Sequence, residues 1–198
     1  MWDSKKASRI CLGCVAFGGY DYGKIRKVDC INTIHAALDQ GINTFDTAAI
    51  YGLGKSEEIL GEALRKKREA ILITKFGLFK NTNNETVRDL SPDKIPLQAE
   101  QSLRRLKRDF IDLYLIHWYD DKTPIDEVIS QLVRLQKQGK IKAYGCSNFN
   151  RDLIDPIINH VHALQVPYSL GQNEYEDGLQ KCHSHQQFTM AYNVLMRG

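Results

Sequence analysis

The chain has 198 residues, with 27 Lys and Arg against 24 Asp and Glu and a formal net charge of +3 at pH 7. That charge is too small to indicate a nucleic-acid partner, and a mean hydropathy of −0.40 argues against a membrane protein. The length favours a single domain over residues 1–198, and the opening MWDSKKASRI lacks the apolar core of a secretory signal, so we expect a cytoplasmic protein.

The cysteines and the basic residues do not indicate a metal or nucleic-acid site. Five scattered cysteines, an odd number, favour reduced thiols over a disulfide framework. Cys11 with Cys14, and the CHSH stretch at residues 182–185, each lack the distant ligands that a zinc site needs, so we expect no metal. The basic stretch at residues 102–109 is typical of the charged end of a solvated helix.

In the first half of the chain, short apolar runs alternate with longer stretches that have apolar residues at helical spacing. Gly41 is placed to end one helix, and Ser56 to cap the N-terminus of the next. The predicted elements, in chain order, are a strand around residues 11–14, a helix at 28–40, a strand at 42–46, a helix at 55–67 and a strand at 70–75.

The alternation continues through the second half. Ser91 with Pro92, and Thr123 with Pro124, each indicate a helix start with a capping residue followed by proline at the first helical position. The predicted elements are a polar loop at residues 81–89, a helix at 91–106, a strand at 110–117, a helix at 123–139, a strand at 142–147, a helix at 150–159, a strand at 162–167, a helix at 173–183 and a strand at 188–195.

Regular alternation of strand and helix predicts an α/β fold with a parallel sheet. The spacing is near the ~31 residues per unit of a (β/α)8 TIM barrel, and the chain holds about seven βα units, so the barrel is incomplete. The alternative is an open dinucleotide-binding sheet, which needs G-x-G-x-x-G after its first strand. The glycines Gly13, Gly18 and Gly19 do not fit that spacing, which favours the barrel.

Polar residues end several of the predicted strands. Asp46, Lys75, His117 and the pair Ser147 and Asn148 each terminate an apolar run, and Tyr51 lies in the loop after Asp46. Each alone is compatible with a structural role, such as capping a turn or forming a boundary. In a barrel, however, the residues that follow the strands converge on one face, so we expect these side chains to meet.

The converging groups form a chemically sensible acid catalyst. A free tyrosine has a pKa near ~10, and a neighbouring ammonium such as Lys75 lowers it, while Asp46 keeps that lysine charged. Tyr51 could then donate a proton to a carbonyl oxygen, and His117 could offer a second hydrogen bond. No side chain can supply the reducing equivalent, whereas a nicotinamide cofactor can.

Five stretches, in order and at suitable spacing, resemble those that mark the aldo-keto reductase family. They are GINTFDTAAIYGLGKSEEILGEAL, LITKFG, DFIDLYLIHW, GKIKAYGCSNF and LQVPYSL, and the likeness runs from about Ser8 to Gly198. The resemblance implies a (β/α)8 barrel and the reversible reduction of a small-molecule aldehyde or ketone. It also implies NADPH as the cofactor, with NADH as the alternative.

The resemblance also implies roles for individual residues. The catalytic residues would be Asp46, Tyr51, Lys75 and His117, with Tyr51 as the proton donor. The cofactor-binding residues would be Asp46, Ser147, Asn148, Gln165, Tyr192 and Asn193. Ser147, Asn148 and Gln165 would hold the nicotinamide carboxamide and Tyr192 would stack on the ring, while the VAFGG stretch would border cofactor or substrate. Asn193 stands where relatives of this branch usually have serine, so the resemblance does not carry over the hydrogen bond from that serine to the cofactor.

The family continues past the position of AYNVLMRG with a long loop, a helix, an eighth strand and a segment that binds the adenosine phosphates. We therefore expect a C-terminally truncated member with weak or no turnover, since lost phosphate contacts lower cofactor affinity. Unpaired edges of strands 1 and 7 would favour self-association. Two other interpretations stay open, a non-catalytic protein or cofactor-sensing partner subunit, and a metal-dependent barrel hydrolase using Asp46 and His117.

Overall fold

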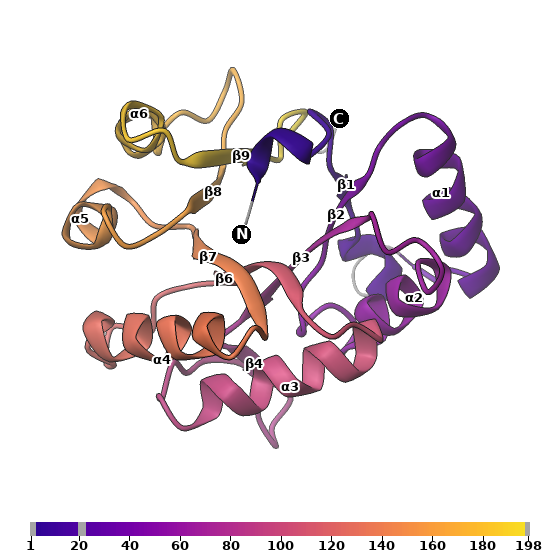
Figure 1. Ribbon diagram of the computed structural model, residues 1–198, viewed down its shortest axis with the longest axis horizontal. Helices are drawn as coiled ribbons and strands as arrows, with labels where there is room; N and C mark the ends of the chain where they lie inside the picture. The colour runs from indigo at the N-terminus through magenta and orange to yellow at the C-terminus, as the bar shows by residue number, and fades with distance from the viewer. Residues whose placement is uncertain (1–2, 20–22, 197–198) are drawn as a thin grey trace.

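The sheet is the centre of the molecule. In a computed structural model that describes residues 3–19 and 23–196, seven parallel strands form one curled sheet with the helices outside it (Figure 1). This confirms the predicted α/β class and the incomplete (β/α)8 barrel. In sheet order the strands are β1 (Leu12–Gly13), β2 (Thr44–Asp46), β3 (Ile71–Phe76), β6 (Ile111–Ile116), β7 (Ile141–Ser147), β8 (Ala163–Pro167) and β9 (Phe188–Tyr192).

Each predicted helix has a counterpart, with boundaries shifted by a few residues. The α-helices are α1 (Lys27–Asp39), α2 (Lys55–Ala63), α3 (Lys94–Leu106), α4 (Ile125–Lys137), α5 (Arg151–Ile154) and α6 (Glu176–Ser184). Short 3-10 helices are η1 (Ser4–Lys6), η2 (Val15–Gly18) and η3 (Asp155–Ile157). Tyr20, at the end of the CLGCVAFGGY stretch, lies outside the described residues.

The two predicted serine- or threonine-proline helix starts are wrong. Helix α3 begins after Pro92 rather than at it, so Ser91 precedes the helix instead of capping it. At α4, Pro124 is itself the N-cap, with an extended backbone at φ −53° and ψ 125°. The Thr123 hydroxyl donates to the Asp120 carboxylate at 2.8 Å, so it stabilises the preceding loop and does not cap the helix.

A β-hairpin replaces much of the predicted polar loop at residues 81–89. Strands β4 (Leu78–Lys80) and β5 (Thr86–Arg88) pair antiparallel and form a separate two-stranded sheet. The Asn81 side chain accepts hydrogen bonds from the backbone N–H groups of Asn83 and Glu85, both at 2.9 Å, which organises the turn. Strands of three residues are too short to show a periodic pattern, so the sequence did not reveal them.

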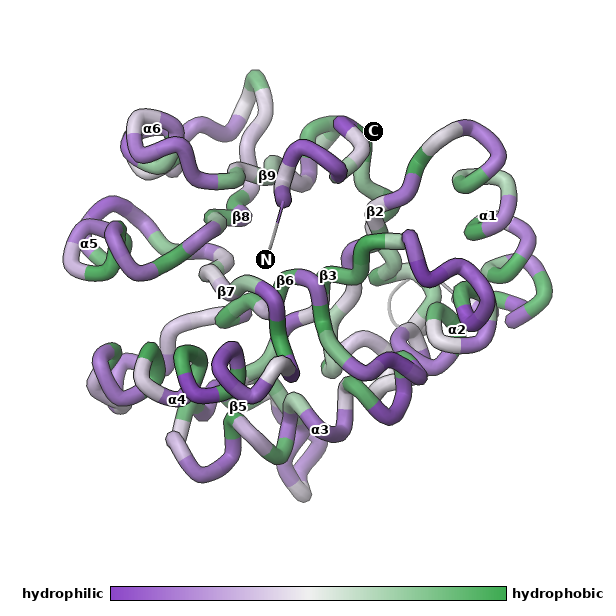
Figure 2. Tube along the Cα trace, in the orientation of Figure 1, coloured by the Kyte–Doolittle hydropathy of each residue, from purple (hydrophilic) through white to green (hydrophobic). Residues whose placement is uncertain are grey.

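The central strands bury both faces, as expected for a parallel sheet covered by helices. Neighbouring residues on a strand point to opposite faces, so Leu72 packs beneath the helices while Ile73 packs inside the curled sheet. The helix tubes in Figure 2 alternate between hydrophilic and hydrophobic colour, consistent with one face packed on the sheet. Within the described ranges, every helix is too short or too polar to cross a membrane.

The order of the sheet begins at β1 and finishes at β9, so these two strands are its edges. The segment around η1 lies beside β9 in Figure 1. Ala7 and Cys11 pack against the same interior cluster as Met190 of β9, so the N-terminal segment covers part of the open side. The carboxyl ends of the strands remain accessible, and they carry the residues of interest.

Candidate active site

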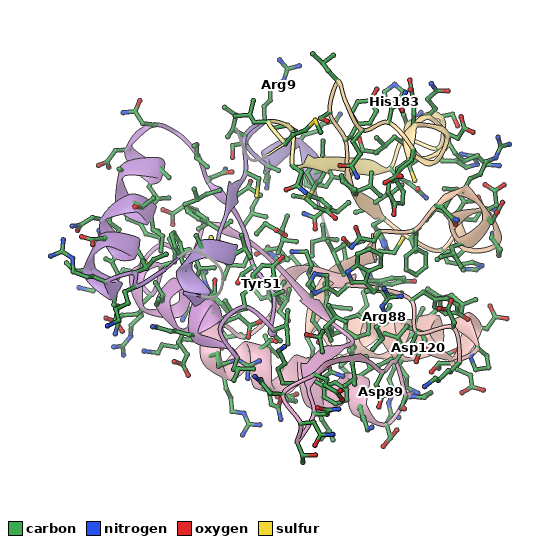
Figure 3. All side chains as sticks on the ribbon, turned by 180° about the vertical axis from the view of Figure 1, so that it is seen from behind. Arg9, Tyr51, Arg88, Asp89, Asp120 and His183 are labelled. Carbon is green, nitrogen blue, oxygen red and sulfur yellow. The ribbon has the colours of Figure 1, made fainter. Side chains whose placement is uncertain are left out.

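A cavity of about 280 Å³ lies at the carboxyl ends of the parallel strands. Figure 3 shows Tyr51 near the middle of the molecule, among the strands. All of the residues predicted for catalysis and cofactor binding line this cavity: Asp46, Tyr51, Lys75, His117, Ser147, Asn148, Gln165, Tyr192 and Asn193. They meet because parallel strands present their carboxyl ends at the same edge of the sheet.

Lys75 is the buried cation of the cavity. Its ammonium lies 2.8 Å from each carboxylate oxygen of Asp46 and 2.8 Å from the carbonyl oxygen of Thr47, and the lysine side chain is only 2% exposed. Burial by itself lowers the pKa of Lys75, but the negative charge of Asp46 and the hydrogen bonds to Asp46 and Tyr51 raise it above its ordinary value. Lys75 therefore stays protonated at neutral pH.

Tyr51 lies in the turn between β2 and α2, next to this cation. The Lys75 ammonium is 5.2 Å from the centre of the Tyr51 ring, and the ring packs edge-on against His117 with centroids 5.8 Å apart. Burial raises the pKa of Tyr51, and the charge of Lys75 offsets only part of that rise. Lys75 thus lowers the pKa of Tyr51 as expected, but desolvation outweighs the ammonium, so the pKa lies above its ordinary value and Tyr51 keeps its proton at neutral pH.

The turn that carries Tyr51 is held by buried hydroxyl groups. The Thr47 hydroxyl donates to the Ser56 hydroxyl at 2.8 Å, and Ser56 donates in turn to the Cys14 carbonyl at 2.8 Å. The Ser56 backbone N–H also donates to the Tyr51 carbonyl at 3.3 Å. The prediction that Ser56 caps α2 is wrong, because Gly54 occupies the N-cap position and the Ser56 hydroxyl bonds to another segment.

Two glycines let the backbone of this turn approach η2. A Cβ atom on Gly18 would lie 2.5 Å from the backbone nitrogen of Gly52, and one on Gly52 would lie 2.4 Å from the Gly18 carbonyl oxygen. Gly52 also has a positive φ of 61°, a conformation that side chains disfavour. Backbone contact between these glycines therefore sets the position of the turn next to Tyr51.

His117 is buried, at 8% exposed, and its Nδ1 atom has no hydrogen-bond partner within the described part of the chain. Burial, with a further contribution from the positive charge of Lys75, holds the pKa of His117 well below its ordinary value. The ring is therefore neutral at pH 7, and a neutral imidazole can donate one hydrogen bond to a ligand in the cavity.

Asn148 links three strand ends. Its backbone is in the left-handed region at φ 62°, and its side-chain nitrogen donates to the His117 carbonyl at 3.0 Å and to the Ser147 hydroxyl at 3.1 Å. The Tyr192 hydroxyl donates to the Asn148 side-chain oxygen at 2.6 Å. Both ends of the Asn148 amide are thus engaged, which places β6, β7 and β9 in a fixed relation around the cavity.

The donors of two other residues suit a carboxamide ligand. The Ser147 hydroxyl accepts from Asn148 and still has its own hydrogen to donate. Gln165 is buried, at 3% exposed, and its side-chain nitrogen has only a weak acceptor, the Met190 sulfur at 3.8 Å. A buried amide with so poor a partner fits a site completed by a polar ligand, such as the carboxamide of a nicotinamide.

Sequence reasoning missed three residues that also line the cavity: Gly13, Cys14 and Trp118. Cys14 was interpreted only as a thiol without the partners of a zinc site, and Gly13 only as a mismatch to a dinucleotide motif. Trp118 directly follows the strand end at His117, so the rule that selected His117 could have included it. The described residues hold no group of three His, Cys, Asp or Glu side chains arranged for a metal ion, which leaves the hydrolase interpretation without a ligand set.

The sequence matches known proteins over nearly its whole length. A family model described as "Aldo/keto reductase family" matches residues 9–198. The chain is 41% identical to Aldo-keto reductase YhdN of Bacillus subtilis (strain 168), over 98% of the chain and 60% of that protein. It is 33% identical to the NADH-specific methylglyoxal reductase of Escherichia coli (strain K12), over 96% of the chain and 64% of that protein.

Solved structures give the same result. The glycerol dehydrogenase AKR11B4 from Gluconobacter oxydans superposes with a TM-score of 0.90 at 42% identity, over 97% of this chain and 61% of that one. An aldo-keto reductase from Klebsiella pneumoniae in complex with NADPH superposes with a TM-score of 0.77 at 28% identity, over 94% of this chain and 63% of that one. The chain thus spans less than two thirds of the length of each of these relatives.

Proposed function

Because this chain belongs to the aldo/keto reductase family, we propose that it reduces an aldehyde or a ketone to an alcohol with NADPH, with Tyr51 as the proton donor. The observation that carries this proposal is the Lys75 ammonium, bonded to both oxygens of Asp46 and lying beside the Tyr51 ring. Nothing observed favours the non-catalytic alternative.

Tyr51 acts as the general acid. As negative charge develops on the substrate oxygen, the phenol transfers its proton to that oxygen, and the Lys75 ammonium stabilises the phenolate that remains. The raised pKa of Tyr51 is compatible with this role, because an alkoxide is more basic than a phenolate. Neutral His117 donates a hydrogen bond to the same oxygen and orients the carbonyl group. A bound nicotinamide cofactor supplies the hydride that adds to the carbonyl carbon.

Ser147 and Gln165 would hold the carboxamide of a bound cofactor with the donors described above, and Tyr192 would stack on its ring. Asn148, also expected to hold the carboxamide, has both ends of its amide already engaged and would act by placing its neighbours. Asp46 and Asn193 line the same space. The relative from Klebsiella pneumoniae was solved with NADPH, which supports NADPH here. The relative from Escherichia coli is named as NADH-specific, so NADH is the second cofactor to test.

Tyr51→Phe tests the proposal, because it removes the proton and leaves the ring. We expect reduction of nitrobenzaldehyde, followed by the loss of NADPH absorbance, to fall by about 10²- to 10⁴-fold, with the Kd for NADPH unchanged by fluorescence titration. Tyr168→Phe, at a half-buried tyrosine outside the cavity lining, is the matched control and should keep full activity. Equal turnover in the wild type and Tyr51→Phe would remove Tyr51 from its role.

A further inference from the structure

Trp118 forms part of the cavity wall immediately after His117 and is half-buried. It belongs to the loop between β6 and α4, and within the described residues its indole N–H donates no hydrogen bond that would fix the ring. A large side chain on a loop needs packing partners to keep one orientation, because holding it in a single rotamer loses conformational entropy. The structure supplies such a partner from another segment.

Arg88, at the end of the β4–β5 hairpin, stacks on Trp118. Its guanidinium carbon lies 4.6 Å from the centre of the indole, and its Nη1 donates to the Tyr119 carbonyl at 3.3 Å. Arg88 is exposed, and it forms no ion pair with any residue that the structure describes. The indole face and the neighbouring carbonyl are therefore its two partners, and a planar guanidinium suits both.

The hairpin segment and the Trp118 loop are joined at a second, buried point. The Leu90 backbone N–H donates to an Asp120 carboxylate oxygen at 2.9 Å, and Asp120 also accepts from the backbone N–H of Thr123 at 3.0 Å. Arg88 and Asp120 lie close together in Figure 3, in agreement with these bonds. Arg88 also bonds to the loop backbone at Tyr119, but Asp120 holds that backbone at a buried point without it, so the main effect of Arg88 is on the side chain of Trp118.

We propose that Arg88 is a positioning residue that sets substrate preference by holding Trp118 as a rigid wall of the catalytic cavity. This inference rests on the proposed carbonyl reduction and adds a role for the hairpin, which carries no residue of the cavity itself. A large aromatic aldehyde must contact the wall and loses affinity when the indole is free to rotate. A small aliphatic aldehyde reaches Tyr51 and His117 without that contact.

The test uses Trp2→Phe as the parent, because the chain has two tryptophans and Trp118 then supplies all of the tryptophan emission. Arg88→Ala and Arg88→Lys are made in this parent. The matched control is Arg26→Ala, which removes an exposed arginine of the α1 N-terminus whose partner, among the residues that the structure describes, is Asp29. Acrylamide quenching of Trp118 fluorescence reports the freedom of the indole, and KM and kcat are measured for naphthaldehyde and for propanal.

We expect Arg88→Ala to raise acrylamide quenching and to raise the KM for naphthaldehyde by about 2- to 5-fold, the range of an exposed cation–π contact. The KM for propanal and both kcat values should stay unchanged, Arg88→Lys should be intermediate, and Arg26→Ala should match the parent. Unchanged quenching in Arg88→Ala overturns the inference, as does an equal change for both aldehydes. A parent without turnover contradicts the proposed function, and the quenching comparison still decides whether Arg88 holds Trp118.

Discussion

The charge of Lys75 influences the protonation of two other residues in the cavity. It adds to burial in lowering the pKa of His117, and it opposes the effect of burial on Tyr51. The result at neutral pH is one cation, a neutral imidazole and a neutral phenol within one small space. Two hydrogen-bond donors and a fixed positive charge are the groups that a developing oxyanion needs.

The buried, neutral His117 predicts a loss of stability in mild acid. In the unfolded chain its pKa returns to about 6.5, so below that pH the unfolded state takes up a proton that the folded state does not bind. The free energy of unfolding should therefore fall as the pH decreases, by up to about 1.4 kcal/mol from this residue between about pH 7.5 and 5.5. His117→Gln should remove that part of the decrease, measured by urea unfolding at both pH values.

His162 provides the comparison, because burial also lowers its pKa and it contributes in the same direction. Only a part of the total pH dependence should disappear in His117→Gln, and His162→Gln should remove a separate part. If the urea midpoint of His117→Gln changes with pH as much as that of the wild type, His117 is not buried in its neutral form.

At the scale of elements, the turn between β2 and α2 is positioned by contacts with other segments. Helix α2 begins at a glycine N-cap without a side-chain capping bond. Its second residue, Ser56, is fully buried and joins the turn at Thr47 to the backbone at Cys14. Thr47 in turn offers its carbonyl to Lys75, so the same short network connects the helix start to the buried cation.

Ser56→Ala should destabilise the protein more than an ordinary serine replacement. It leaves the Thr47 hydroxyl and the Cys14 carbonyl without their partner in a dry environment, at a cost of about 1–3 kcal/mol. Ser130→Ala is the matched control, because Ser130 is exposed and its hydroxyl, within the described part of the chain, bonds to the Asp126 carbonyl of the same helix. The control should change the free energy of unfolding by less than about 0.5 kcal/mol. Equal losses in the free energy of unfolding, measured with urea, would show that the buried hydroxyl of Ser56 stabilises the protein no more than the exposed hydroxyl of Ser130.

At the scale of the whole molecule, β9 pairs with β8 on one side, and no strand of the described residues pairs with it on the other. The Phe188 backbone N–H donates to the His162 carbonyl, and the Tyr192 carbonyl accepts from Tyr168, so alternate residues of β9 bond to its inner side. By the alternation of a parallel ladder, the backbone groups of Thr189 and Ala191 face the open side. Unpaired backbone groups of this kind can pair with another chain.

We therefore expect this chain to self-associate through β9, and Ala191→Lys to weaken that association by at least about tenfold, since an edge lysine opposes strand pairing. Ala191 is exposed, so the lysine fits without disturbing the core. Ser130→Lys adds the same charge at an exposed position of α4, a helix that packs on α3 and β7, and is the control. Sedimentation velocity over a range of concentrations measures the change, and identical behaviour of the two variants would exclude the β9 edge as the contact.

Much of this fold follows from periodicity. The strands that end at Asp46 and His117 are short apolar runs followed by polar residues, and the amphipathic pattern at residues 123–139 requires a helix on the outside of a sheet. Helix starts were less predictable, because serine and threonine hydroxyls at Ser56 and Thr123 bond to distant or neighbouring groups rather than to their own helices. A serine or threonine hydroxyl can cap its own helix or bond to another nearby group at similar free energy, and tertiary contacts decide which bond forms.

The sequence by itself determined the order of strands and helices and the residue types at the strand ends, since both depend on local pattern and on the rule that parallel strands share one active edge. Only the tertiary structure decided the balance of burial against charge at Tyr51, whose pKa rises although a lysine lies beside it. It alone also brought Arg88 onto Trp118. Desolvation and contacts between distant segments depend on how the whole chain packs, and no local pattern encodes them.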